Sequence, residues 1–136
     1  MEEFSFESDI EVICIKADSF SMGVKAAHEK LHSLIPFSTD RKYFGISWGG
    51  EHGAIHYQAA AEILTPEESK LPETKPFTIR KGKYMSIVIK DYMNDIQSIG
   101  RTFSQLLLLE NLDPNGYCLE WYISNHDVRC MVPVKS

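Results

Sequence analysis

The sequence predicts an α+β fold in which two strand–helix–strand–strand modules form one curved antiparallel sheet. Both helices are expected on one face, with a ligand cleft between the modules. The main evidence is that the same order of elements occurs twice, over about residues 10–64 and 77–134. A polar, proline-containing connection, residues 65–75, separates the copies almost at the midpoint of the chain. We interpret residues 1–136 as a single domain with an internal duplication and a pseudo-two-fold axis.

Each element is predicted from its hydrophobic pattern. Apolar residues at helical spacing predict helices over residues 20–34 and 92–112, and Ser19 or Ser21 is a candidate cap for the first. A glycine-rich turn over residues 49–53 joins two strands into a hairpin. The expected strands are rich in β-branched and aromatic residues, and they cover residues 10–16, 43–48, 54–64, 77–79, 84–90, 117–124 and 128–134.

Strict alternation assigns strand side chains to one face or the other. In IHYQAAAEIL, Tyr57 and Ala59 fall on one face, whereas His56, Gln58 and Glu62 fall on the other. The helices cover one face of the sheet, so the other face is expected to be partly uncovered. A concave, uncovered face at a pseudo-two-fold axis is a natural cleft for a small molecule.

The composition excludes several classes of protein. A net charge of −5, with scattered basic residues, argues against direct nucleic-acid binding. Three cysteines without a CxxC motif favour neither a disulfide framework nor a zinc site. The start of the chain is acidic and has no secretion signal, and no apolar run approaches the roughly 20 residues of a membrane span. We therefore expect a cytoplasmic protein with no membrane partner.

Two short motifs match catalytic patterns only by their letters. Residues 28–32 (HEKLH) have the HExxH spacing of zinc proteases, but the helix is short and no third ligand follows in context. Residues 45–49 (GISWG) match GxSxG, but they run into a hairpin rather than a strand-to-helix turn. No phosphate-binding loop or dinucleotide fingerprint occurs. We therefore expect no metal and no cofactor.

Four segments together carry a family resemblance: YFGIS at 43–47, IHYQAAAEI at 55–63, FTIRKGKY at 77–84 and LEWY at 119–122. In this order and at these separations they resemble the GyrI-like family, which includes the effector-binding domains of bacterial multidrug-sensing transcription regulators. The resemblance covers nearly the whole chain. It implies a stand-alone, single-domain form, because the chain has no room for a DNA-binding helix-turn-helix domain.

Glu120 matches the acidic residue of the last family motif. In a strand it shares a face with Cys118 and Tyr122, whereas Leu119 and Trp121 lie on the more apolar, expected core face. The resemblance implies that the carboxylate lies at the floor of an aromatic pocket and pairs with cationic, lipophilic ligands. Burial raises the pKa of such a carboxyl, and a bound cation lowers it. The alternative is a solvent-exposed strand glutamate.

Aromatic side chains are the expected lining of the pocket, and an ordinary core position is the alternative for each of them. The ligand-binding candidates are Glu120, Tyr122, Tyr57, Trp48, Tyr84, Phe77 and Trp121. Glu62 is the pseudo-symmetric counterpart of Glu120 in the first copy, and two carboxylates in one cleft can perform acid/base chemistry. The catalytic candidates are therefore Glu120, Glu62 and Tyr122, although an exposed position on the hairpin edge is the alternative for Glu62.

Three functions follow from this interpretation. The favoured one is binding of a lipophilic, cationic or polyaromatic small molecule, such as a drug or toxin. A second is hydrolysis of strained, cyclopropanoid-type electrophiles, which relatives in the family perform. A third is modulation of another protein, as in gyrase-inhibitor-like members. A homodimer and a separate regulatory protein are the partners considered besides the small-molecule ligand.

Overall fold

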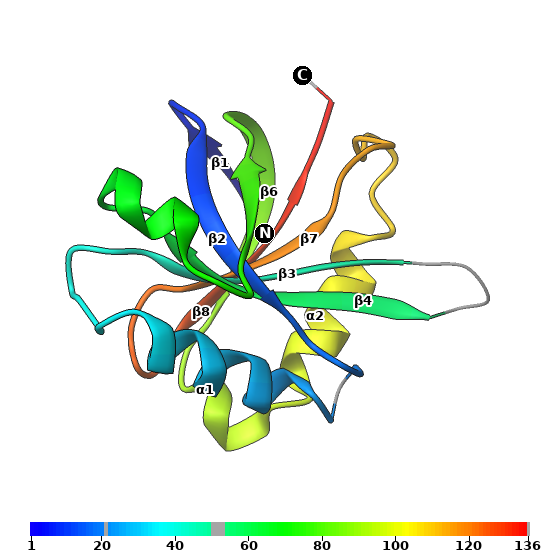
Figure 1. The fold of residues 1–136 in the computed structure, drawn as a ribbon. Helices are drawn as coiled ribbons and strands as arrows, with labels where there is room; N and C mark the ends of the chain where they lie inside the picture. Colours follow the sequence, from blue (N-terminus) through cyan, green and yellow to red (C-terminus); the bar gives the residue numbers. More distant parts are fainter. Residues whose placement is uncertain (21, 50–53, 136) are drawn as a thin grey trace.

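The computed structural model describes residues 1–20, 22–49 and 54–135, and within these ranges eight strands form one antiparallel sheet (Figure 1). The strand order is β1-β6-β8-β7-β3-β4-β2-β5. The strands are β1 (Glu2–Phe6), β2 (Ile10–Lys16), β3 (Tyr43–Gly49), β4 (Ile55–Glu62), β5 (Lys75–Ile79), β6 (Gly82–Ile89), β7 (Cys118–Tyr122) and β8 (Val128–Pro133). The helices are α1 (Val24–Leu34) and α2 (Ser98–Leu106), with short 3-10 helices η2 (Pro66–Lys70) and η3 (Tyr92–Asp95).

The pairing repeats between the two halves of the chain. In the first half β2 and β3 both pair with β4, and in the second half β6 and β7 both pair with β8. Strands β3 and β7 join the halves at the centre, while β5 and β1 extend the two edges. The predicted α+β class, with one curved antiparallel sheet, is confirmed.

Both helices cover the same face of the sheet (Figure 1). Directly paired residues of antiparallel strands point to the same side. One such row crosses the sheet through Ile15, Ala59, Gly45, Glu120, Cys130 and Ile87. Helix α1 packs Leu31 on one end of this helix-side face, and α2 packs Phe103 and Leu106 on the other.

The opposite face of the sheet is not left uncovered, in contrast to the expectation. The sheet curls so that this face fills with its own apolar side chains, which include Val12, Phe44, Ile46, Leu119 and Met131, each fully buried. The face therefore forms a second core.

Several element boundaries differ from the prediction. Strand β1 was not predicted, because two glutamates precede its apolar alternation; Arg129 anchors it by donating to Glu2 and stacking on Phe4. The single helix predicted over residues 92–112 is instead η3 followed by the shorter α2. Asn94 and Asp95 interrupt it, since such side chains compete with helical backbone hydrogen bonds.

The first helix also begins later than predicted, at Val24. Gly23 precedes it without a side-chain cap, and the Ser19 carbonyl accepts the Gly23 N–H at 2.9 Å. The other candidate cap, Ser21, and residues 50–53 of the glycine-rich turn lie outside the described residues.

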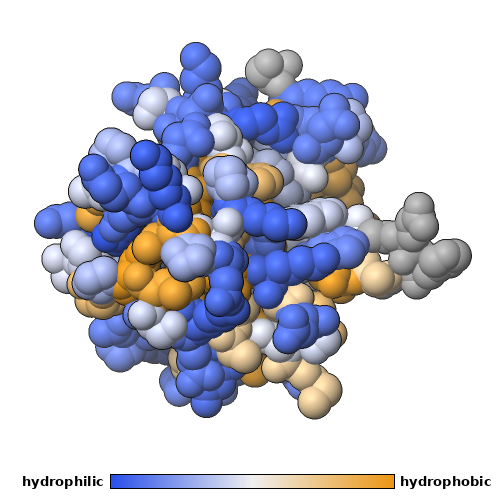
Figure 2. All heavy atoms as spheres, in the orientation of Figure 1, coloured by the Kyte–Doolittle hydropathy of each residue, from blue (hydrophilic) through white to orange (hydrophobic). Residues whose placement is uncertain are grey.

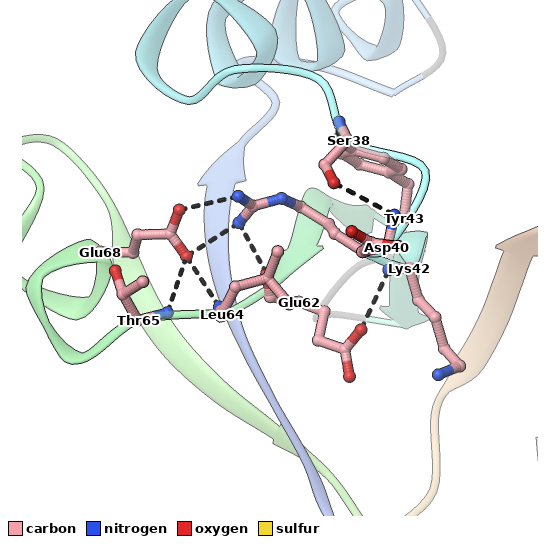
Figure 3. A network of polar contacts seen from close by, with 9 residues as sticks. Ser38, Asp40, Lys42, Tyr43, Glu62, Leu64, Thr65 and Glu68 are labelled. Carbon is pink, nitrogen blue, oxygen red and sulfur yellow. Dashed lines mark hydrogen bonds and ion pairs between the residues drawn. The ribbon is translucent and has the colours of Figure 1, made fainter.

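A buried ion pair fastens the connection between the halves to the end of β4 (Figure 3). The Arg41 guanidinium, in a residue only 8% exposed, donates two hydrogen bonds to the Glu68 carboxylate and a third to the Glu62 carbonyl. The same carboxylate accepts the backbone N–H groups of Leu64 and Thr65, at 2.7 and 3.3 Å. These donors hold the pKa of Glu68 at about 2, well below its ordinary value.

Replacing Glu68 with glutamine is expected to lower the free energy of unfolding by about 2 kcal/mol, because the buried Arg41 charge loses its counter-charge. Because the pKa of Glu68 is lowered by folding, its stabilisation is complete above about pH 4.5 and is lost as the pH falls towards 2. Urea unfolding of the wild type and Glu68→Gln should therefore converge in acid. The control is Glu67→Gln, an exposed position on the same short helix, and equal losses in the two variants would contradict the prediction.

Hydrophilic residues cover most of the side of the molecule seen in Figure 2, and the largest hydrophobic area on it lies between η2 and α1. Within the described ranges, no helix has the length and apolar character needed to cross a membrane.

Candidate functional site

Glu120 lies at the centre of the sheet, on the middle residue of β7. It pairs with Gly45 of β3 on one side and with Cys130 of β8 on the other. Its side chain is on the helix-side face and is only 7% exposed. The sequence predicts that Leu119 and Trp121 face the core, because their side of the strand is the more apolar one. In the structure both faces are covered, so the carboxylate is buried beneath the helices.

Two tyrosines hold the carboxylate. The Tyr122 hydroxyl donates to Oε1 of Glu120, and the Tyr57 hydroxyl donates to the same oxygen at 3.3 Å. The two hydroxyl oxygens are 3.1 Å apart, so the three side chains form one cluster. Gly45 makes this cluster possible, because a Cβ there would lie 2.0 Å from the Tyr57 hydroxyl and 3.0 Å from Oε1 of Glu120.

Burial dominates the electrostatics of the cluster. It raises the pKa of Glu120, and the hydrogen bonds from Tyr122 and Tyr57 only partly oppose this effect. Burial and the charge of Glu120 raise the pKa of both tyrosines well above the ordinary value, so their hydroxyls stay protonated as donors. Within the part of the chain that the structure describes, no lysine or arginine forms an ion pair with Glu120.

Three further rings surround the cluster, and the sequence did not assign them to the site. Phe20 lies 6.0 Å from the Tyr57 ring, and Tyr92 lies 5.9 Å from the Tyr122 ring. His28 meets the Tyr122 ring edge-on at 5.4 Å, and its Nε2 is 2.8 Å from the Tyr57 hydroxyl. The helical pattern could have identified His28, because it is a polar residue on the same side of α1 as the buried residues Ala27 and Leu31.

The four other aromatic candidates do not reach Glu120. They lie on the opposite face, where they pack against the second core: Trp48, Phe77, Tyr84 and Trp121. Tyr84, for example, is fully buried and its hydroxyl is 2.6 Å from that of Tyr117. Period-two alternation explains the separation, because Trp121 directly follows Glu120 and must point the other way.

Glu62 is also separated from Glu120. It directly follows Ala61, which packs on the helix-side face, so the Glu62 side chain points to the opposite face. Its Oε1 accepts the backbone N–H of Lys42 at 3.1 Å (Figure 3). The structure therefore does not bring the two carboxylates of the acid/base hypothesis into one cleft.

The HExxH spacing on α1 does not create a metal-binding cluster. His28 is hydrogen-bonded to Tyr57, and the His32 ring lies 5.0 Å from that of Tyr43. Among the residues described by the structure, no three histidine, cysteine, aspartate or glutamate side chains are grouped to hold a metal ion.

A cleft of about 170 Å³ lies where β3 ends and β7 begins, beside the segment that follows α2. It is lined by Ser47 and Cys118, by Trp48 and Tyr117 of the opposite face, and by Leu107 at the end of α2. Ser47 and Cys118 pair directly, one same-face step along β3 and β7 from Gly45 and Glu120. That step is about 7 Å, since each strand residue advances the chain about 3.3 Å. The cleft is thus separated from the carboxylate, and none of Glu120, Tyr57 and Tyr122 lines it.

Comparisons with known proteins show the fold. No family model and no curated protein matches the chain. An integron cassette protein from the mobile metagenome of Vibrio cholerae has a similar structure, with a TM-score of 0.72 and 15% identity over 98% of this chain and 95% of that one. A hydrolase from Listeria innocua has a TM-score of 0.54 and 9% identity, over 98% of this chain and 90% of that one. Neither is described as GyrI-like, and at these identities the likeness shows the fold alone.

Proposed function

We propose that the protein binds a lipophilic cation, such as a drug or toxin, with Glu120 as its counter-charge. The observation that carries this proposal is a buried carboxylate that, among the described residues, accepts hydrogen bonds only from hydroxyl donors. Within the described ranges, no cationic side chain pairs with it. The proposal agrees with the resemblance to multidrug effector-binding domains.

The energetics of burial favour a cation over other ligands. An ionised carboxylate without a counter-charge is costly to bury, and its pKa rises as a result. A bound cation restores the ionised form, and the faces of Tyr57, Tyr122 and Tyr92 attract positive charge as well. An anion gains none of these interactions and meets the charge of Glu120.

The size and place of the cleft bear on how a ligand reaches the carboxylate. Drug-sized ligands fill pockets of about 300–1,000 Å³. The cleft beside Ser47 and Cys118 is smaller, at about 170 Å³. Glu120 does not line this cleft and is buried, so a ligand that contacts the carboxylate displaces side chains that cover it.

Tetraphenylphosphonium and tetraphenylborate test the proposal, because they have nearly the same shape and opposite charge. We expect the cation to bind at least about tenfold more tightly than the anion, since the ionised Glu120 attracts one and repels the other. Isothermal titration calorimetry is the suitable measurement, because both tryptophans pack on the opposite face and are poor fluorescence reporters. Equal affinities, or tighter binding of the anion, would refute the proposal.

A further inference from the structure

We infer that His28 carries the proton that Glu120 releases when a cation binds, and so connects the buried carboxylate with solvent. The coupling to a ligand rests on the proposed function. The proton path itself is a property of the unliganded protein and can be tested without any ligand.

A continuous chain of hydrogen bonds leads from the carboxylate to α1. Oε1 of Glu120 contacts the hydroxyls of Tyr122 and Tyr57, which are 3.1 Å from each other. The Tyr57 hydroxyl is in turn 2.8 Å from Nε2 of His28. Glu120 and Tyr57 are buried, whereas Tyr122 and His28 are both partly exposed, so the chain of hydrogen bonds leads from a buried carboxylate to a partly exposed imidazole.

Each hydroxyl has a single proton, so the charge of Glu120 determines which group donates and which accepts in each of these hydrogen bonds. When Glu120 is ionised, Tyr122 and Tyr57 both donate to Oε1, and the Tyr57 oxygen accepts Nε2–H from His28. When Glu120 is protonated, it donates to Tyr122, Tyr122 donates to Tyr57, and Tyr57 donates to Nε2. The neutral imidazole then carries its proton on Nδ1 instead of Nε2.

Conversion between these states transfers one proton to solvent. The O–H bond of Glu120 breaks and its proton binds the Tyr122 oxygen, while Tyr122 passes its own proton to Tyr57. Tyr57 passes its proton to Nε2 of His28, which briefly becomes an imidazolium. The Nδ1–H bond then breaks and that proton goes to water. Glu120 is left ionised, both tyrosines are neutral, and His28 is in the Nε2–H form.

The other titratable groups near the cluster are less suited to this role. Burial raises the pKa of Tyr92, Cys118 and Cys130, so these groups keep their protons. His32 and Glu29 lie on α1 too, but the His32 ring packs beside Tyr43 and Glu29 is exposed. Burial, together with His32, lowers the pKa of His28 to about 4, so the imidazole is neutral except while it transfers the proton.

Nuclear magnetic resonance of the unliganded protein tests the path. The ring nitrogens of His28 are assigned by comparison with His28→Gln and followed over the pH range in which the protein stays folded, together with the Glu120 carboxyl carbon. We expect the His28 tautomer to change from Nδ1–H to Nε2–H with the same midpoint as Glu120. His32, four residues away on the same helix, is the internal control and should not follow that step.

Two variants make the outcome decisive. In Tyr57→Phe the chain is broken, so the His28 tautomer should no longer follow the ionisation of Glu120. A His28 tautomer that is unchanged through the titration of Glu120, and also unchanged in Glu120→Gln, overturns the inference. Failure of tetraphenylphosphonium to bind would instead count against the proposed function and leave this proton path in place.

Discussion

Replacing Glu120 with glutamine is expected to weaken tetraphenylphosphonium binding about 100-fold at neutral pH, because a buried charge pair contributes on the order of 3 kcal/mol. Glutamine has nearly the same shape and can still hydrogen-bond Tyr122 and Tyr57, so the loss reports the charge. Calorimetric titration of the wild type and the variant measures the difference.

The pH dependence of tetraphenylphosphonium affinity is a second test of the role of the Glu120 charge. Because folding raises the pKa of Glu120, the carboxyl is neutral in acid and a proton competes with the cation. Wild-type affinity should therefore rise about tenfold per pH unit below that pKa and level off above it. The Glu120→Gln profile should be flat.

Glu62→Gln is the matched control for this prediction. It is the same substitution on the opposite face, where Glu62 accepts the backbone N–H of Lys42. Its tetraphenylphosphonium affinity should stay within about twofold of the wild type, since surface charges are screened. Equal losses in the two variants would mean that overall charge, rather than the buried carboxylate, attracts the cation.

Part of this site was predictable from local pattern. Alternation along β7 is enough to place Glu120 and Tyr122 on one face, and the structure agrees. The contact between Tyr57 and Tyr122 could not be derived from alternation, because it depends on the register of β3 between β4 and β7; only the family resemblance placed both residues in one pocket. Such register is set by long-range pairing, which a single sequence does not reveal.

The curl of the sheet explains why four aromatic candidates lie away from Glu120, namely Trp48, Phe77, Tyr84 and Trp121. Their composition suits a ligand pocket and a protein core equally, and only the closure of the opposite face decides between them. Trp121 contacts Phe4 of β1, a strand that the sequence did not predict. Because the sequence pattern did not predict β1, nothing was expected to cover that part of the opposite face.

Gly45 has the largest expected effect on stability. A Cβ at this position would lie 2.0 Å from the hydroxyl oxygen and 2.7 Å from the Cζ atom of Tyr57. The Tyr57 ring is fully buried and its hydroxyl is bonded to His28 and Glu120, so it cannot move aside without loss. We expect Gly45→Ala to lower the free energy of unfolding by about 3 kcal/mol, at the upper end for overpacking of a core.

The same substitution should also alter the chemistry of the site. A Tyr57 hydroxyl pushed away from Oε1 no longer stabilises the ionised form, so the pKa of Glu120 rises further. The pH at which tetraphenylphosphonium affinity levels off should therefore move upward in Gly45→Ala. Urea unfolding and calorimetry at several pH values measure the two effects separately.

Gly49→Ala on the same strand is the control that isolates the cause. A Cβ at Gly49 would meet no atom of the described residues within 4 Å, so its cost should stay within about 0.5 kcal/mol. Both substitutions replace a β3 glycine that does not have a positive φ, so backbone strain contributes to neither. Equal stability of the two variants would show that Tyr57 yields easily, and that the contact among Tyr57, Gly45 and Glu120 does not hold the carboxylate in place.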